Sequence, residues 1–189
     1  MPLISVFVLP TAWLEFHLLP KARWAVILGL VNALLLYLPW ALAINATQHL
    51  TIGPLGAPIG FFMVAIGLFL WATALPLIVR VPGQMRSLPE RLVEEGSYRW
   101  IRHPIYLSHF LLIGGAALGF GAPRVFLETP ILLGMAAIGA KHEESRRLLP
   151  RFGKTFEEYE AKTPFLLPTW GWVVPGFIYI WVGLRVFLF

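Results

Sequence analysis

Residues 96–106 read Gly-Ser-Tyr-Arg-Trp-Ile-Arg-His-Pro-Ile-Tyr, a basic and aromatic segment placed directly before an apolar run. Proline is well suited to the first turn of a helix, where its missing N–H leaves no hydrogen bond unmade. The residue before a proline is pushed away from helical backbone angles. A helix is therefore predicted to begin at Pro104, with its positive end beside Arg99, Arg102 and His103. Such a helix start favours a carboxylate or a phosphate.

The composition of the chain is that of a multi-pass membrane protein. Of its 189 residues, 58% are hydrophobic and 13% are charged, and several apolar runs approach the roughly 20 residues that a spanning helix needs. Cysteine is absent, which excludes disulfides, thiolate nucleophiles and cysteine metal sites. Aspartate is absent as well, which removes the usual ligands of a magnesium site. The net charge of +5 fits positive loops at a membrane surface, so we expect a lipid bilayer and no nucleic acid as a partner.

The apolar runs predict an all-α integral membrane protein, one domain over residues 1–189, with about five transmembrane helices. The predicted segments are 24–44, 59–79, 105–120, 125–140 and 173–189. Because four residues separate the third segment from the fourth, these two should form an antiparallel helical hairpin over 105–140. Gly115 and Gly119 form a small-xxx-small pair that permits close helix packing. Residues 1–20 are apolar too, and their sequence leaves a spanning and an interfacial helix both open.

The charges predict the orientation of the chain. If the first four segments cross the bilayer, 13 of the 15 lysines and arginines fall on one side. The positive-inside rule makes that side the cytoplasm. The basic segment at 96–106 and the charged, amphipathic segment at 141–163 then share the cytoplasmic face.

Two glutamates, Glu143 and Glu144, follow the fourth apolar segment on that same face. Carboxylates bind an ammonium group or ribose hydroxyls, so together with the arginines this face offers both charges that an amino-acid-like ligand requires. Nearby aromatic rings can pack on a flat ring or on a sulfonium. The residues alone also fit a simpler interpretation, in which the arginines and tyrosines anchor the membrane interface and the glutamates lie on a solvated helix face.

Two motifs resemble those of a known family. Residues 92–106 resemble the signature L-V-x-x-G-x-Y-x-x-x-R-H-P-x-Y of the isoprenylcysteine carboxyl methyltransferases, and phospholipid methyltransferases carry a similar segment. The second motif of that family, E-E…L…F-G-x-x-Y-x-x-Y…P, is similar to Glu143-Glu144, Leu148, Phe152-Gly153, Tyr159 and Pro164. The resemblance covers about residues 90–168. Phe156 replaces the first tyrosine of the family's pair, and Lys162 replaces a common arginine.

The resemblance implies an integral-membrane methyltransferase that uses S-adenosylmethionine, with its catalytic core at 90–168 and its cofactor site on the cytoplasmic face. Its implied cofactor-binding residues are Tyr98, Arg102, His103, Pro104, Tyr106, Glu143, Glu144 and Tyr159. Glu144 aligns more securely with the family pattern than Glu143. The implied methyl acceptor is a lipid-like molecule that enters from the bilayer.

The chemistry of the acceptor decides which residues are catalytic candidates. A carboxylate acceptor is already ionised and needs only to be oriented, for which Arg99 or Lys162 is suited. An amine or a thiol must lose a proton, and His103 or Glu144 is then the candidate base. A prenylated cysteine carboxylate is the acceptor most like that of the family, and an ethanolamine head group and a small hydrophobic thiol remain alternatives.

Two other classes of protein remain open. Membrane sterol reductases, which use NADPH, carry a similar segment but with R-H-x-N-Y, so Pro104 directly after His103 favours the methyltransferase. The non-enzymatic alternative is a scaffold or transport subunit whose basic face binds anionic lipid. It predicts no effect of the charge-conserving substitution Arg102→Lys.

Overall fold

The computed structural model describes residues 22–47, 49–50, 52–80 and 89–188, and for residues 22–30 and Val79 it describes the backbone alone. The predicted apolar stretch at 1–20 lies outside the described residues. Within these ranges, every regular element is a helix. The elements are α2 (Ala22–Ala46), α3 (Gly56–Val79), η2 (Gly96–Arg99), α4 (Pro104–Gly119), α5 (Pro123–Glu128), α6 (Pro130–Glu143), η3 (Glu144–Leu148), α7 (Leu149–Phe152), α8 (Lys154–Lys162), η4 (Thr169–Trp172) and α9 (Val173–Leu188).

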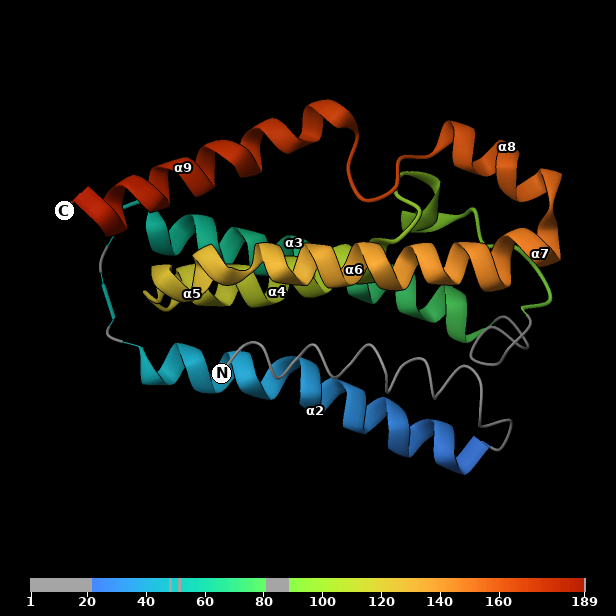
Figure 1. Cartoon of the computed structure of the whole chain (residues 1–189), viewed down its shortest axis with the longest axis horizontal. Coiled ribbons are helices and arrows are strands. Elements are labelled where there is room, and N and C mark those ends of the chain that lie inside the picture. The colour runs from blue at the N-terminus through green and yellow to red at the C-terminus, as the bar shows by residue number, and fades with distance from the viewer. Residues whose placement is uncertain (1–21, 48, 51, 81–88, 189) are drawn as a thin grey trace.

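The long helices run side by side and alternate in direction, as Figure 1 shows. Helices α3 and α6 run toward the end of the bundle that carries α8, and α4 runs away from it. The predicted antiparallel hairpin is therefore present, with its turn at residues 120–122 and α5 at the start of its second arm. The basic segment before α4 and the charged segment after α6 lie at the same end of the bundle, as the spacing of the apolar runs predicts.

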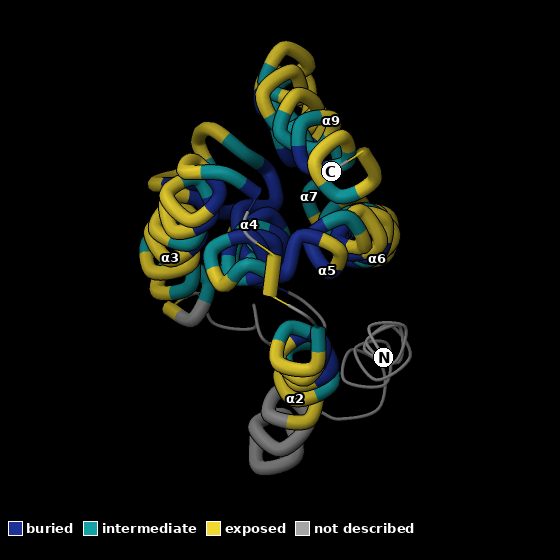
Figure 2. Tube along the Cα trace, turned by 90° about the vertical axis from the view of Figure 1, so that its left-hand side faces the viewer, coloured by how far each residue is buried: buried dark blue, intermediate teal, exposed yellow. Residues whose placement is uncertain are grey.

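Helix α4 forms the centre of the bundle. In the view along the bundle it is mostly buried, between α3 on one side and α5 and α6 on the other (Figure 2). Its buried residues include Phe110, Ile113 and Leu118. At 16 residues it is about 24 Å long, shorter than the roughly 30 Å hydrocarbon core of a bilayer. Its neighbours cover it instead of lipid.

Glycines let α3 and α4 approach until their backbones touch. A Cβ atom on Gly60 would lie 2.3 Å from the backbone N of Gly119 and 2.6 Å from the backbone O of Gly115. The predicted small-xxx-small pair on α4 is thus used, but its partner is α3 and not the other helix of the hairpin. Close backbone approach through small residues is typical of helices that associate in membranes.

Among the described residues, three helical stretches are long and apolar enough to cross a membrane: Gly56–Ile78, Pro123–Phe152 and Thr169–Leu188. Their outward faces are apolar as well. Phe62 and Phe69 on α3 and Phe177 and Phe187 on α9 are all more than half exposed. A helix that is apolar on every face lies in a protein core or in a membrane. Two shorter apolar stretches are Pro104–Gly119, which is α4, and Val31–Ala46, the part of α2 whose side chains the structure describes.

The predicted bounds of the fourth helix, 125–140, are wrong at both ends. The helical stretch begins at Pro123, is interrupted at Thr129, and continues through α6, the π-helical turn η3 and α7 to Phe152. It ends at Gly153, whose φ of 50° is a conformation that residues with side chains rarely adopt. Glu143 and Glu144 consequently lie within a continuous helix.

Candidate functional site

The start of α4 is held in place by the connector that follows α8. Pro104 occupies the first turn, as predicted, and His103 has the non-helical angles φ −127° and ψ 61°. The backbone N–H groups of Arg102 and His103 donate to the carbonyl oxygens of Pro164 and Phe165, over 2.9 Å and 3.3 Å. The two motifs are therefore joined by backbone hydrogen bonds, which fix the direction in which Arg102 and His103 point.

A buried carboxylate links the two halves of the site. Glu144 accepts a hydrogen bond from Nε2 of His103 over 2.9 Å, and NH1 of Arg102 lies 3.3 Å from the same oxygen. The Glu144 side chain is 6% exposed. A charge that is buried this far is tolerated only when it is paired and hydrogen-bonded. Because Nε2–H donates its hydrogen bond to the carboxylate, Nδ1 is the nitrogen through which a neutral His103 can accept a proton.

Helix α8 contributes a second carboxylate, Glu160, which also forms an ion pair with Arg102. Nζ of Lys141 lies 2.6 Å from Glu144 and 3.4 Å from Glu160. Lys141 and Arg102 both lie over the ring of Phe165, at 5.0 Å and 5.5 Å from its centroid. The hydrogen bond from Arg102 holds the pKa of the Glu160 carboxyl below its ordinary range, so this ion pair persists at neutral pH.

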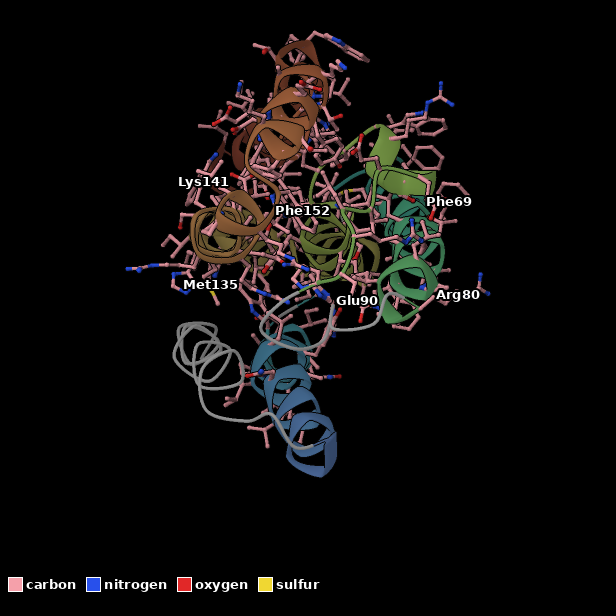
Figure 3. All side chains as sticks on the ribbon, turned by 90° about the vertical axis from the view of Figure 1, so that its right-hand side faces the viewer. Phe69, Arg80, Glu90, Met135, Lys141 and Phe152 are labelled. Carbon is pink, nitrogen blue, oxygen red and sulfur yellow. The ribbon has the colours of Figure 1, made fainter. Side chains whose placement is uncertain are left out.

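A cavity of about 350 Å³ lies between these two halves and α3. Figure 3 looks onto this end of the bundle, where α3 ends near Arg80 and α7 ends at Phe152. The polar part of the cavity wall includes Tyr98, Arg102, His103, Tyr106, Glu143, Arg147 and Tyr159, and its apolar part includes Leu75, Ile78, Leu92, Val93, Ile105 and Leu148. A concave site of this volume with a few polar groups is typical of small-molecule binding.

Glu143 is the carboxylate that the cavity contains. It lies 3.4 Å from NH1 of Arg147 and accepts a hydrogen bond of 3.4 Å from the hydroxyl of Tyr106. Consecutive residues on a helix with 3.6 residues per turn point about 100° apart, so Glu143 and Glu144 face different surroundings. Glu143 lines the cavity, whereas Glu144 lies behind its wall and supports Arg102 and His103.

Two tyrosines close the cavity on the side of η2 and α8. The hydroxyl of Tyr159 donates to the carbonyl oxygen of Tyr98 over 2.6 Å, which joins α8 to η2. Burial, and then the charge of Glu143, raises the pKa of Tyr98 well above its usual value. Burial, and then the charge of Glu94, does the same to the pKa of Tyr159. Both phenols are therefore neutral and serve as hydrogen-bonding groups and flat rings, not as bases.

Six of the residues predicted for the site line this one cavity. They are Tyr98, Arg102, His103, Tyr106, Glu143 and Tyr159. Pro104 is buried at the helix start, and Glu144 is buried behind the wall. Pro104 and Glu144 therefore affect the cavity by positioning the residues beside them.

The structure does not bring Arg99 and Lys162 into that cavity. Both are exposed and line a separate depression of about 630 Å³, on the other side of Tyr159. That depression also carries the carboxylates Glu94, Glu95 and Glu158. The geometry therefore does not support Arg99 or Lys162 as the group that orients an acceptor beside His103.

Sequence reasoning missed several residues at the site. Glu160 and Lys141 complete the charge cluster, and Arg147 and His109 belong to the cavity wall. A signal for Arg147 was present, because it stands four residues after Glu143 on one helix face. Glu160 directly follows Tyr159, but nothing in the sequence pairs it with Arg102. His109 stands three residues after Tyr106, a spacing that places these two side chains on one face of α4.

Comparison of the chain with protein-family models, with curated proteins and with solved structures finds no match.

Proposed function

We propose that this protein is an integral-membrane methyltransferase that uses S-adenosylmethionine, and that it methylates a lipid-like acceptor. The reaction it resembles most is carboxyl O-methylation of an isoprenylated cysteine, with the cofactor bound at the cytoplasmic face. One observation carries the proposal. Two sequence motifs, whose His103 and Glu144 stand 41 residues apart, meet around a single cavity, and six residues named from the motifs line it.

The charges in the cavity fit the cofactor. S-adenosylmethionine carries a carboxylate, an ammonium and a sulfonium, and the cavity wall carries the cations Arg102 and Arg147 and the carboxylate Glu143. The Nε atom of Arg102 is buried and makes no hydrogen bond within the described part of the chain. A buried donor without a partner costs about 1–3 kcal/mol, so a ligand that supplies an acceptor there gains affinity.

Each part of the cavity has a role in this proposal. Arg102 and Arg147 would hold the cofactor carboxylate, and Glu143 would hold its ammonium group. The faces of Tyr98 and Tyr106 suit a sulfonium or a flat base. When bound, the cofactor supplies a methyl group activated by the positive sulfur. The protein residues orient the donor and the acceptor, which is the main requirement of an in-line displacement.

The volume of the cavity favours S-adenosylmethionine over NADPH. A site of about 350 Å³ is near the lower end of the range of about 300–1,000 Å³ for ligand pockets. S-adenosylmethionine contains one nucleoside. NADPH contains two nucleosides joined by a diphosphate and carries a further phosphate, so it needs a larger site. Among the methyl acceptors, a carboxylate needs no base, whereas an amine or a thiol would transfer its proton to His103, the candidate base that lines the cavity.

Calorimetry on the purified protein in detergent tests the cofactor. We expect S-adenosylmethionine to bind and NADPH not to bind. Arg102→Lys should weaken binding because lysine keeps the charge but loses the planar fork of donors. Arg124→Lys is the matched control. Arg124 is exposed in α5, which lies at the opposite end of the bundle from the cavity (Figure 1).

A labelled-methyl assay on native membranes tests the reaction, with the labelled product identified by mass spectrometry. His103→Ala and Glu144→Ala should abolish transfer, the first by removing a cavity residue and the second by releasing Arg102 and His103. The proposal fails if the protein does not bind S-adenosylmethionine and both variants behave like the parent protein. Salt-sensitive lipid binding that Arg102→Lys leaves unchanged would instead indicate a lipid-binding scaffold.

A further inference from the structure

His109 lies at the apolar part of the cavity, apart from the charge cluster. It shares the cavity wall with Leu75 and Ile78 of α3 and with Ile105 of α4. It stands six residues after His103, which directly precedes α4, so it lies deeper along the bundle axis by about 9 Å. A polar ring in such surroundings requires a hydrogen-bond partner or a function.

Helix α2 supplies a partner for one of the two ring nitrogens. The hydroxyl of Tyr37 lies 2.5 Å from Nδ1 of His109, and the two rings meet edge to face with their centroids 5.6 Å apart. Tyr37 is not part of the cavity wall. The Nδ1 side of the imidazole is thus used to fix the ring against α2, and Nε2 is the ring nitrogen left for a ligand.

The hydrogen bonds available to Tyr37 indicate which ring nitrogen of His109 carries the proton. If Nδ1–H donated to Tyr37, the phenol hydrogen would need another acceptor, and the described residues offer Tyr37 none besides His109. A donor left unpaired in apolar surroundings costs about 1–3 kcal/mol. The favoured arrangement has the Tyr37 hydroxyl donating to Nδ1, which places the imidazole proton on Nε2.

We propose that His109, fixed by Tyr37, is a positioning residue that donates a hydrogen bond from Nε2 to an oxygen of an apolar ligand. The ligand class is an amphiphile with a carbonyl or carboxylate oxygen beside its hydrocarbon chain. This inference rests on the proposed function, in which such a molecule is the methyl acceptor. It assigns the orientation of the oxygen to a neutral donor inside the cavity, in place of Arg99 or Lys162 outside it.

Dodecanoate and dodecane provide matched probes, because they share a chain length and differ in the oxygens. The protein is prepared with nitrogen-labelled histidine in detergent, and the ring nitrogens are observed by NMR. We expect Nε2 of His109 to be protonated in the free protein and its resonance to move with dodecanoate but not with dodecane. His49 is the internal reference, since its Nδ1 donates to the carbonyl oxygen of Phe120 over 2.7 Å, at the other end of α4.

Variants measure the strength of the contact. His109→Phe keeps a ring but removes the donor and should weaken dodecanoate binding by about tenfold, the loss of one hydrogen bond. His109→Gln retains a donor and should recover part of that loss. Tyr37→Phe should also weaken binding, because Nε2 is then no longer held as the protonated nitrogen. Tyr179→Phe is the matched control, since it removes a 2.5 Å contact with Thr129 away from the cavity.

The outcomes separate this inference from the proposed function. Equal dodecanoate affinity in the parent protein and His109→Phe overturns the inference, as does a Nε2 resonance that responds alike to both probes. Retained S-adenosylmethionine binding by His109→Phe reports that the variant is folded. If the parent protein binds no S-adenosylmethionine, the proposed function fails, and the NMR result on His109 is still read on its own.

Discussion

Replacing Glu144 by glutamine is expected to weaken the fold, whereas the same change at Glu143 is expected to weaken ligand binding. The two residues are adjacent in sequence and chemically identical, so each variant is the control for the other. Their surroundings differ. The Glu144 side chain is 6% exposed and contacts Arg102, His103 and Lys141, whereas the Glu143 side chain is 18% exposed and lines the cavity.

The contacts set the expected size of each effect. A hydrogen bond to a charged group contributes about 1.5–3 kcal/mol, and an ion pair with an exposed residue such as Lys141 contributes less than about 1 kcal/mol. Glutamine keeps one oxygen for His103 but loses the charge that Arg102 requires. We therefore expect Glu144→Gln to lower the free energy of unfolding by about 2–3 kcal/mol.

Glu143 has weaker contacts within the protein. Its two polar contacts are both 3.4 Å long, so Glu143→Gln should cost about 0.5 kcal/mol of stability. If Glu143 binds the ammonium group of S-adenosylmethionine, the charge-assisted hydrogen bond is worth about 2 kcal/mol, which corresponds to about a thirtyfold increase in Kd.

Two measurements on the same samples separate these effects. The free energy of unfolding is obtained from a denaturing-detergent titration, and the Kd for S-adenosylmethionine from calorimetry. Glu144→Gln should lose stability, and Glu143→Gln should lose affinity with near-parental stability. The reasoning is refuted if both variants lose stability equally, or if Glu143→Gln binds the cofactor as tightly as the parent protein.

Three further predictions follow from contacts elsewhere in the fold. Gly60→Ala should destabilise the protein by about 1–3 kcal/mol through overpacking, because its Cβ would meet the backbone of α4. Gly134→Ala is the control, since a Cβ there has no atom within 4 Å. Equal free energies of unfolding for the two variants would contradict the close packing of α3 on α4. Tyr159→Phe should cost about 1 kcal/mol by removing its 2.6 Å hydrogen bond, measured in the same titration, and an unchanged value would contradict that contact. The lowered pKa of Glu160 has its main cause in Arg102, so its stabilisation is present above its ordinary pKa of 4.5 and is lost as the pH falls through the lowered value. The stability difference between the parent protein and Glu160→Gln should vanish over that acidic range, and a difference that persists would argue against the ion pair.

Much of the fold could be predicted because a helix that faces lipid is a long apolar run in the sequence. Long apolar runs predicted α2, α3 and α9 to within a few residues, and Pro104 predicted the start of α4. Proline forbids certain backbone angles wherever the chain places it, so that signal is local. The bounds of the fourth helix were wrong because hydropathy falls at Lys141, whereas backbone hydrogen bonding continues to Phe152.

The sequence by itself determined the helical class, the apolar segments and the set of residues from which the site is drawn. These properties depend on residue type and on spacing along one helix. The tertiary structure decided which of those residues share a cavity. It placed Glu143 in the cavity wall and Glu144 behind that wall, and it brought Glu160 to Arg102 from a distant helix. Such pairings depend on how helices pack against one another, and that packing is set by contacts between residues far apart in the chain.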